Sequence, residues 1–135
     1  MLQPHDVTES PFKGKTGFVR IVNALFNSIA GLKSAWQFES AFRQEVVLAA
    51  IMIPIALWVP VTPIERAFLV STVLLVIIVE LLNSSVEAAI DRIGVELHSL
   101  SKRAKDIGSA AVLVSLLLCA FVWATILVPV YFRSP

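Results

Sequence analysis

The chain has a single cysteine among its 135 residues, and this residue, Cys119, lies inside an apolar run. A disulfide framework and a cysteine-based metal site within one subunit are therefore excluded, and we expect Cys119 to be a small packing residue. An excess of one charge is also lacking, since 11 Lys and Arg residues stand against 10 Asp and Glu residues. This balance gives no reason to expect nucleic acid or an acidic partner.

The known sequence motifs of nucleotide-binding loops and protein kinases are missing as well. No Gly-x-x-x-x-Gly-Lys-Ser/Thr, Gly-x-Gly-x-x-Gly, His-Arg-Asp or Asp-Phe-Gly string occurs, which excludes the P-loop and protein-kinase routes to phosphoryl transfer. Residues 1–12 are polar, contain two prolines and lack the apolar run and cleavage site of a signal peptide. We expect a disordered tail over residues 1–15, followed by one domain over residues 16–135.

Apolar residues, in contrast, are abundant. They make up 57% of the chain, whose mean hydropathy is +0.82. A soluble domain of this size needs fewer for its core, so the surplus faces lipid. About 20 helical residues cross a hydrocarbon core about 30 Å thick, and three apolar stretches stand out. The first, Val46 to Val61, is short for a crossing and must take in residues before it, such as Ala41 and Phe42. The predicted fold class is an all-α integral membrane protein with spans over about residues 41–60, 63–92 and 107–131.

A proline-rich turn separates the first two spans. Pro60 and Pro63 stop one helix, while Thr62, Pro63 and Glu65 fit the N-cap, N1 and N3 positions of the next. The second helix therefore begins near Pro63 and runs for about 30 residues. The polar stretch from Asp91 to Asp106 then links it to the third span.

An amphipathic segment precedes the first span. Its apolar residues recur at helical spacing and are Phe18, Ile21, Val22, Leu25, Phe26, Ile29, Leu32 and Trp36. We expect a helix over about residues 16–38 that lies along the cytoplasmic membrane surface. Nine Lys and Arg residues precede the first span or lie between the second and third, against two on the other side. The positive-inside rule therefore predicts a cytoplasmic N-terminus and a C-terminus on the opposite side.

The second span carries a polar stripe on an otherwise apolar helix. At 100° per residue from Glu80, Asn83 falls at about −60°, Ser84 at about +40°, Glu87 at about −20° and Asp91 at about +20°. A carboxylate that faces lipid costs at least about 2.5 kcal/mol. The stripe is therefore predicted to face a helix bundle or a polar cavity.

Depth in the membrane separates the two glutamates of this stripe. If the helix enters the hydrocarbon near Pro63, Glu80 lies about 26 Å along it and Glu87 about 36 Å, in a core about 30 Å thick. Glu80 then lies just inside the cytoplasmic boundary and Glu87 just outside it. Such a pair suits a reaction between a lipid hydroxyl and a water-soluble polyanion, with the drier carboxylate as a base and the wetter one as a metal ligand.

Other interpretations of these charges stay open at this point. In the first, Glu80 pairs with a donor from a neighbouring helix and serves only structural specificity. In the second, Glu80 carries protons in a small transporter. In the third, the chain is a structural or regulatory membrane subunit. By spacing alone, Glu39 fits a second metal ligand and an exposed charge at a helix start equally well. The cations of residues 102–105 follow from topology, and His98 is by default a loop histidine.

Three strings resemble the prokaryotic diacylglycerol kinase family. They are Glu80-Leu-Leu-Asn83-Ser-Ser-Val-Glu87-Ala-Ala-Ile-Asp91-Arg92, Ala104-Lys105-Asp106-Ile-Gly108-Ser109-Ala-Ala and Ala41-Phe-Arg43-Gln-Glu45. The resemblance covers about residues 16–128, and the Asp91-Arg-Ile-Gly94 and Arg103-Ala-Lys105-Asp106 strings are similar to the Gram-negative branch. The undecaprenol kinases of Gram-positive bacteria are near neighbours, so an undecaprenol substrate is the alternative.

This resemblance implies a homotrimer of three-span subunits in the bacterial inner membrane, with a periplasmic C-terminus. Its composite active sites would combine residues of adjacent subunits at the cytoplasmic interface. The implied reaction transfers the γ-phosphoryl group of ATP to the hydroxyl of diacylglycerol, giving phosphatidic acid and ADP. By the same resemblance Glu80 is the general base, Asn83 positions Glu80 or the hydroxyl, and Glu39 and Glu87 are ligands of the Mg²⁺ bound to ATP.

The resemblance also implies two sets of contacts. The positions that match nucleotide contacts, in addition to Glu39 and Glu87, are Arg20, Asn27, Glu96, His98, Lys105 and Asp106. The positions that match lipid-substrate contacts, in addition to Glu80, are Lys33, Trp36, Ala41, Arg43, Glu45, Arg66, Ser109 and Trp123.

Overall fold

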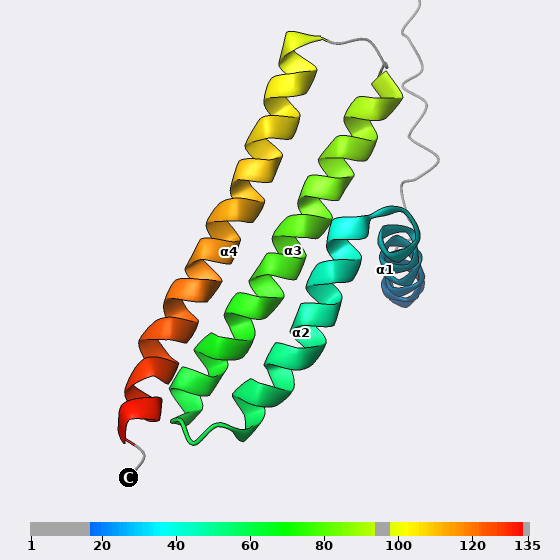
Figure 1. The fold of residues 1–135 in the computed structure, drawn as a ribbon. Helices are drawn as coiled ribbons and strands as arrows, with labels where there is room; N and C mark the ends of the chain where they lie inside the picture. The colour runs from blue at the N-terminus through cyan, green and yellow to red at the C-terminus, as the bar shows by residue number, and fades with distance from the viewer. Residues whose placement is uncertain (1–16, 94–97, 134–135) are drawn as a thin grey trace, which may run out of the picture. The chain divides into compact units, whose positions relative to one another are not determined.

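The computed structural model of the chain describes residues 17–93 and 98–133. These residues form four helices, α1 (Phe18–Phe38), α2 (Ser40–Trp58), α3 (Pro63–Ile93) and α4 (Ser99–Arg133) (Figure 1). The chain divides into two compact units, one that reaches to Ser34 and one that begins at Ala35, and each is described by itself. The tail expected over residues 1–15 and the expected nucleotide contact Glu96 lie outside the described residues.

Helices α2, α3 and α4 are each long and apolar enough to cross a membrane. This confirms the predicted all-α membrane fold with three spans. Helix α1 confirms the helix expected before them, and its large apolar side chains, among them Phe26, Leu32 and Trp36, are exposed in the single chain.

The start of α3 is fixed by a reciprocal pair of side-chain contacts. The Thr62 N–H donates to Glu65 Oε2 at 2.8 Å, and the Glu65 N–H donates to Thr62 Oγ1 at 3.3 Å. These bonds satisfy backbone donors that the first helical turn leaves without partners. The predicted capping positions are therefore correct, and α3 begins at Pro63 as expected.

Helix α4 begins earlier than the span expected from residue 107. Its first residue is Ser99, because His98 acts as a cap: His98 Nδ1 accepts a hydrogen bond from the Leu100 N–H at 3.2 Å, and its carbonyl accepts one from the Lys102 N–H at 3.0 Å. Much of the polar stretch expected to be a linker is thus helical. It extends α4 well beyond its apolar portion.

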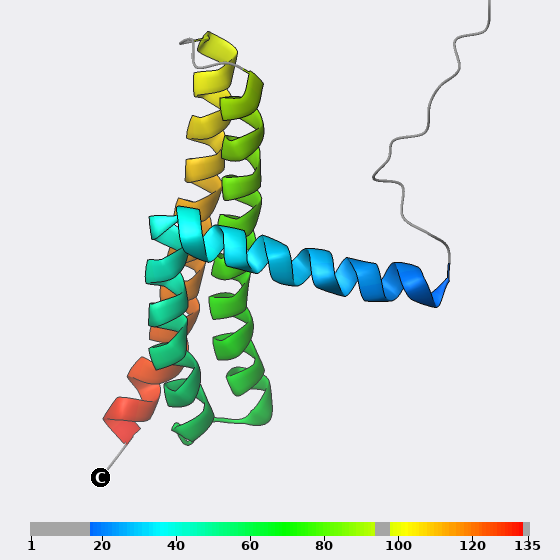
Figure 2. The same cartoon turned by 90° about the vertical axis from the view of Figure 1, so that its right-hand side faces the viewer.

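The bundle core lies along α3, which packs against both α2 and α4 (Figures 1 and 2). The buried residues of this core are Ala49, Ala56, Leu69, Val73, Val76, Cys119 and Trp123. Cys119 is buried and free, as expected of a packing residue. Small residues such as Ala49 and Ala56 let α2 approach α3 closely.

One hydrogen bond fixes α4 against α3 within this core. Trp123 Nε1 donates to the carbonyl oxygen of Leu69 at 3.1 Å, and both residues are buried. From this contact, α3 and α4 run side by side past the first turn of α2 (Figures 1 and 2). The first turn of α2 therefore meets α3 partway along its length.

Candidate active site

Glu80 lies on the buried face of α3. The buried residues of this helix are Leu69, Thr72, Val73, Val76, Glu80 and Ser84, which recur at the three- and four-residue spacing of one helical face. Only 3% of Glu80 is exposed. The carboxylate therefore faces the bundle and not lipid, as the free-energy cost of a charged side chain in hydrocarbon requires.

Four carboxylates gather around this point. Glu39 and Glu87 are close enough to Glu80 to repel its charge, and Glu80 in turn repels the charge of Glu45 on α2. Glu39 directly precedes α2, in an extended conformation at its N-cap, but its side chain makes no capping hydrogen bond. Tertiary packing thus brings Glu39 to the stripe, which its sequence position alone left open.

The carboxylates share an electrostatic field without forming a complete ligand cage. Within residues 17–93 and 98–133, no group of three or more His, Cys, Asp or Glu side chains is placed to hold one metal ion. Mg²⁺ requires less than this, because it usually takes one or two protein carboxylates and completes its shell with water and phosphate oxygens. The oxygen atoms of Glu39 and Glu87 are ligands of the type that Mg²⁺ prefers.

Asn83 is connected directly to Glu87. Asn83 Nδ2 donates to Glu87 Oε1 at 3.0 Å, one helical turn along α3. The Oδ1 atom of Asn83 is buried and has no hydrogen-bond partner among the described residues. The carboxamide therefore orients one oxygen of the Glu87 carboxylate and keeps a polar atom inside the α3–α4 interface.

An ion pair lies at the solvent-exposed end of the stripe. Lys105 Nζ on α4 lies 2.5 Å from Asp91 Oδ1 on α3, with 38% and 64% of the two side chains exposed. The charge of Glu87 also acts on Lys105. The sequence analysis gave Asp91 no role, although its position on the polar stripe could have indicated that it belongs to the site.

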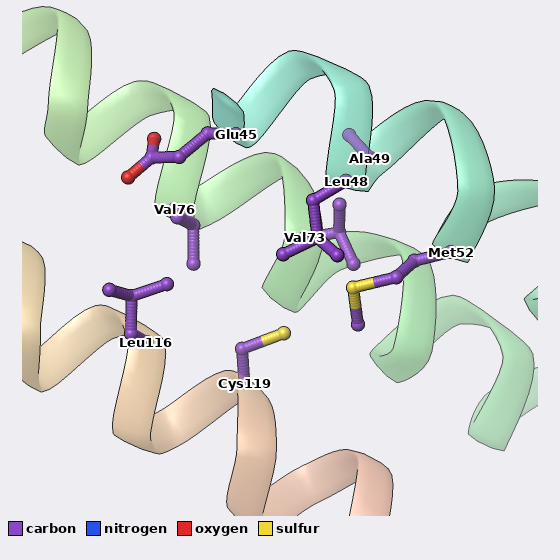
Figure 3. A pocket seen from close by; sticks show the side chains of 8 residues that line it. All are labelled: Glu45, Leu48, Ala49, Met52, Val73, Val76, Leu116 and Cys119. Carbon is purple, nitrogen blue, oxygen red and sulfur yellow. The ribbon is translucent and has the colours of Figure 1, made fainter. Parts of the chain in front are cut away.

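A small apolar cavity adjoins Glu45 (Figure 3). Its volume is about 20 Å³, roughly the room that one water needs. The residues that line it are Glu45, Leu48, Ala49, Met52, Val73, Val76, Leu116 and Cys119. Glu45 Oε2 is buried without a hydrogen-bond partner among the described residues. The cavity is too small for an acyl chain, so it does not by itself form a lipid site.

Several expected contact residues already have structural partners. Arg43 Nη1 donates to the carbonyl oxygens of Trp36 and Gln37, at 2.8 and 3.3 Å. Arg66 Nη2 donates to the Val59 carbonyl at 3.2 Å, near the start of α3 and far along the helix from Glu80. Trp123 is buried in the core.

The remaining expected contacts lie on the surface of the chain. Lys102 Nζ lies 2.7 Å from Asp106 Oδ2, a pair of exposed side chains on α4. The other exposed positions are Trp36, Ala41, His98 and Ser109, together with Arg20, Asn27 and Lys33 in the unit that ends at Ser34. The structure leaves these seven side chains accessible to a ligand.

These features define a class of protein. A helical membrane protein carries a buried carboxylate near the middle of its bundle, wetter carboxylates further along the same helix, and a lysine at their end. Such an arrangement places carboxylates of increasing exposure along α3 and a lysine of α4 at their end, which are groups of the chemical types that accept protons, bind metals and bind phosphate.

Comparisons with known proteins identify the family. The prokaryotic diacylglycerol kinase family matches residues 26–127. A diacylglycerol kinase of Pseudomonas aeruginosa is 50% identical over 121 residues, which are 90% of this chain and 98% of that protein. Diacylglycerol kinases of Escherichia coli K12 and Haemophilus influenzae are 51% and 49% identical over 112 residues, 83% of this chain and 92% and 95% of theirs.

The chain belongs to the prokaryotic diacylglycerol kinase family. This confirms the predicted family and the prediction that the chain is a membrane enzyme of the kinase class. The proton-transporter and structural-subunit interpretations therefore lose their support.

The buried hydroxyl of Ser84 provides a test of which stripe residues are essential. Ser84 Oγ is buried without a hydrogen-bond partner in the described chain, so Ser84→Ala removes an unsatisfied polar atom. We expect the free energy of unfolding to stay the same or to rise by up to about 1 kcal/mol, and activity to stay within about twofold of wild type. Thermal unfolding in detergent and an activity assay measure both, and a large loss of activity would place Ser84 in the chemistry.

Proposed function

We propose that this chain transfers the γ-phosphoryl group of ATP to the hydroxyl of diacylglycerol, with Glu80 as the general base. The observation that carries this proposal is the burial of Glu80 on the same helical face as Asn83 and Glu87, with Glu39 brought to it by α2. A lipid hydroxyl at the membrane boundary meets a water-soluble nucleotide at such a point.

In this reaction the protein forms no covalent intermediate and, for the covalent step, supplies only a proton acceptor. Glu80 accepts the hydroxyl proton while the hydroxyl oxygen bonds to the γ-phosphorus, and the bond from this phosphorus to the bridging oxygen breaks, so that ADP leaves. Positioning and charge stabilisation carry most of the rate in such transfers. A dry site with few competing waters favours both.

Glu39 and Glu87 are the residues we assign to the Mg²⁺ that accompanies ATP. The observations that support this are the Glu39 side chain, which makes no capping bond, and the hydrogen bond by which Asn83 orients Glu87 Oε1. Bound Mg²⁺ would offset the charge of the phosphates. Glu39 and Glu87 would hold the nucleotide in place through it.

Lys105 is the cation we assign to the phosphates, and Asp91 holds it at the end of the stripe. The other proposed nucleotide contacts are Arg20, Asn27, Glu96, His98 and Asp106. The proposed lipid contacts are Lys33, Trp36, Ala41, Arg43, Glu45, Arg66, Ser109 and Trp123. Because the Arg66 and Trp123 side chains already have partners in the bundle, we expect them to act on lipid mainly through packing.

The assembly we propose is a homotrimer in the bacterial inner membrane, with the N-terminus in the cytoplasm and the C-terminus in the periplasm. In the most apolar stretch of each span no more than 33% of the residues are buried in the single chain, and in α4 the share is 11%. Lipid or other subunits must cover this surface. The distribution of Lys and Arg supports the orientation.

The substrate is tested by a lipid panel. Purified chain in detergent, supplied with Mg²⁺ and γ-labelled ATP, is expected to move label into a chloroform-soluble product when diacylglycerol is present. Undecaprenol and a lipid-free control should give little label. Preferred labelling of undecaprenol would overturn the proposed substrate while it preserves the reaction type.

Glu80→Gln separates chemistry from binding. The amide keeps the shape of the side chain but cannot accept the hydroxyl proton, so kcat should fall by at least about 100-fold. Nucleotide affinity should stay near the wild-type value, because Glu80 does not contact the phosphates in this assignment. Equilibrium binding of a fluorescent ATP analogue measures this, and a parallel loss of binding would show that Glu80 is a ligand or a structural residue.

Glu87→Gln is the complementary variant. Loss of one carboxylate charge should raise the Mg²⁺ concentration for half-maximal activity by about 10-fold, in the range found for residues that hold or orient a metal. The KM for ATP should rise with it. A Mg²⁺ titration that matches wild type would count against a ligand role.

A further inference from the structure

Asn83 and Gly108 meet at a close approach of α3 and α4. A Cβ atom placed on Gly108 would lie 2.2 Å from Asn83 Oδ1 and 3.3 Å from Asn83 Cγ. Side chains do not tolerate a contact of 2.2 Å, so any residue larger than glycine must displace the Asn83 carboxamide. Gly31 in α1 offers a contrast, because a Cβ there meets nothing within 4 Å.

The Asn83 carboxamide is held from both sides. Its Nδ2 donates to Glu87 Oε1 at 3.0 Å, and its Oδ1 is buried against the α4 backbone without a hydrogen-bond partner among the described residues. A partly buried amide that makes one hydrogen bond depends on packing for the rest of its orientation. Gly108 supplies that packing surface.

The same face of α4 carries a second contact with the stripe. Lys105, one turn before Gly108, pairs with Asp91 at 2.5 Å. Asn83, Glu87 and Asp91 follow one another at four-residue spacing on α3. Two positions one helical turn apart on α4 therefore meet the first and last members of this row, and Glu87 lies between those two members.

We propose that Gly108 is a positioning residue of the kinase site. Its lack of a side chain lets α4 come close enough to hold the Asn83 carboxamide in the orientation that donates to Glu87. Asn83 thereby fixes the Glu87 carboxylate, and with it the metal and nucleotide that Glu87 is proposed to hold. This inference rests on the proposed role of Glu87. Groups that orient metal ligands typically change affinity or activity by about 10- to 100-fold when they are lost.

A double-mutant cycle over Gly108→Ala and Asn83→Ala tests this, with Gly31→Ala as the matched control. We expect Gly108→Ala to lower kcat/KM for MgATP by roughly 10- to 100-fold and to weaken Mg²⁺-dependent nucleotide binding. Gly31→Ala should stay within about twofold of wild type, because the new methyl group meets no neighbour. Alanine favours a helix over glycine, so a lower midpoint of thermal unfolding at position 108 reports the clash.

The double variant decides the mechanism. In Asn83→Ala the offending atoms are gone, and a Cβ at position 108 lies 4.0 Å from the Asn83 Cβ, an ordinary contact. Adding Gly108→Ala to Asn83→Ala should therefore change nucleotide affinity and the unfolding midpoint by much less than it does in wild type. Losses that simply add would overturn the proposal, as would a Gly108→Ala variant with wild-type binding and kinetics.

Two further results are informative. If Gly108→Ala alone fails to fold, a double variant that folds like Asn83→Ala supports the proposal, and a double variant that also fails refutes it. The cycle in nucleotide binding and thermal unfolding needs no lipid phosphorylation. A wild-type chain that labelled no diacylglycerol would therefore refute the proposed function, while the coupling of Gly108 to Asn83 would still be measured.

Discussion

The arrangement of the helices depends on the cost of exposing a carboxylate to lipid. Glu80 lies within a span, and helices α2 and α4 cover the face of α3 that carries it, which leaves 3% of the residue exposed. Because lipid tails are as apolar as the side chains, helices gain little by burying apolar surface alone in a membrane. A polar stripe gives α3 one face that must be covered. The site and the packing of the bundle therefore have the same physical origin.

Because α3 is long, the solvent exposure of the residues on this stripe increases along the helix. Since α3 and α4 run past the first turn of α2 (Figure 1), residues further along α3 lose the cover that α2 provides. Glu80 is buried, Asn83 and Glu87 are half-buried, and 64% of the Asp91 side chain is exposed. Carboxylates of one chemical type thus meet different surroundings, which agree with the different tasks proposed for them: proton transfer at the buried position and metal binding at the more exposed one.

Local features of the sequence predicted what local interactions decide. The contacts between Thr62 and Glu65 set the start of α3, and helical spacing together with the cost of a lipid-facing carboxylate predicted that Glu80 lies on its buried face. The contacts that sequence left open depend on how α2 and α4 are aligned with α3. Spacing along one helix cannot reveal that Glu39 approaches Glu80, that Lys105 reaches Asp91 or that Gly108 touches Asn83. The early start of α4 was missed for a different reason, since the cap is a histidine and not one of the usual capping residues.

Polar side chains in a membrane bundle need room without a gap that admits lipid or water. A wider spacing between α3 and α4 would accommodate the Asn83 carboxamide, but it would also leave its buried Oδ1 atom open to water and loosen the bond to Glu87. A missing side chain on the neighbouring helix gives the same room at close backbone distance, where dispersion contacts are retained. At Gly108 the requirement of packing and the requirement of the site are therefore met by the same absent methyl group.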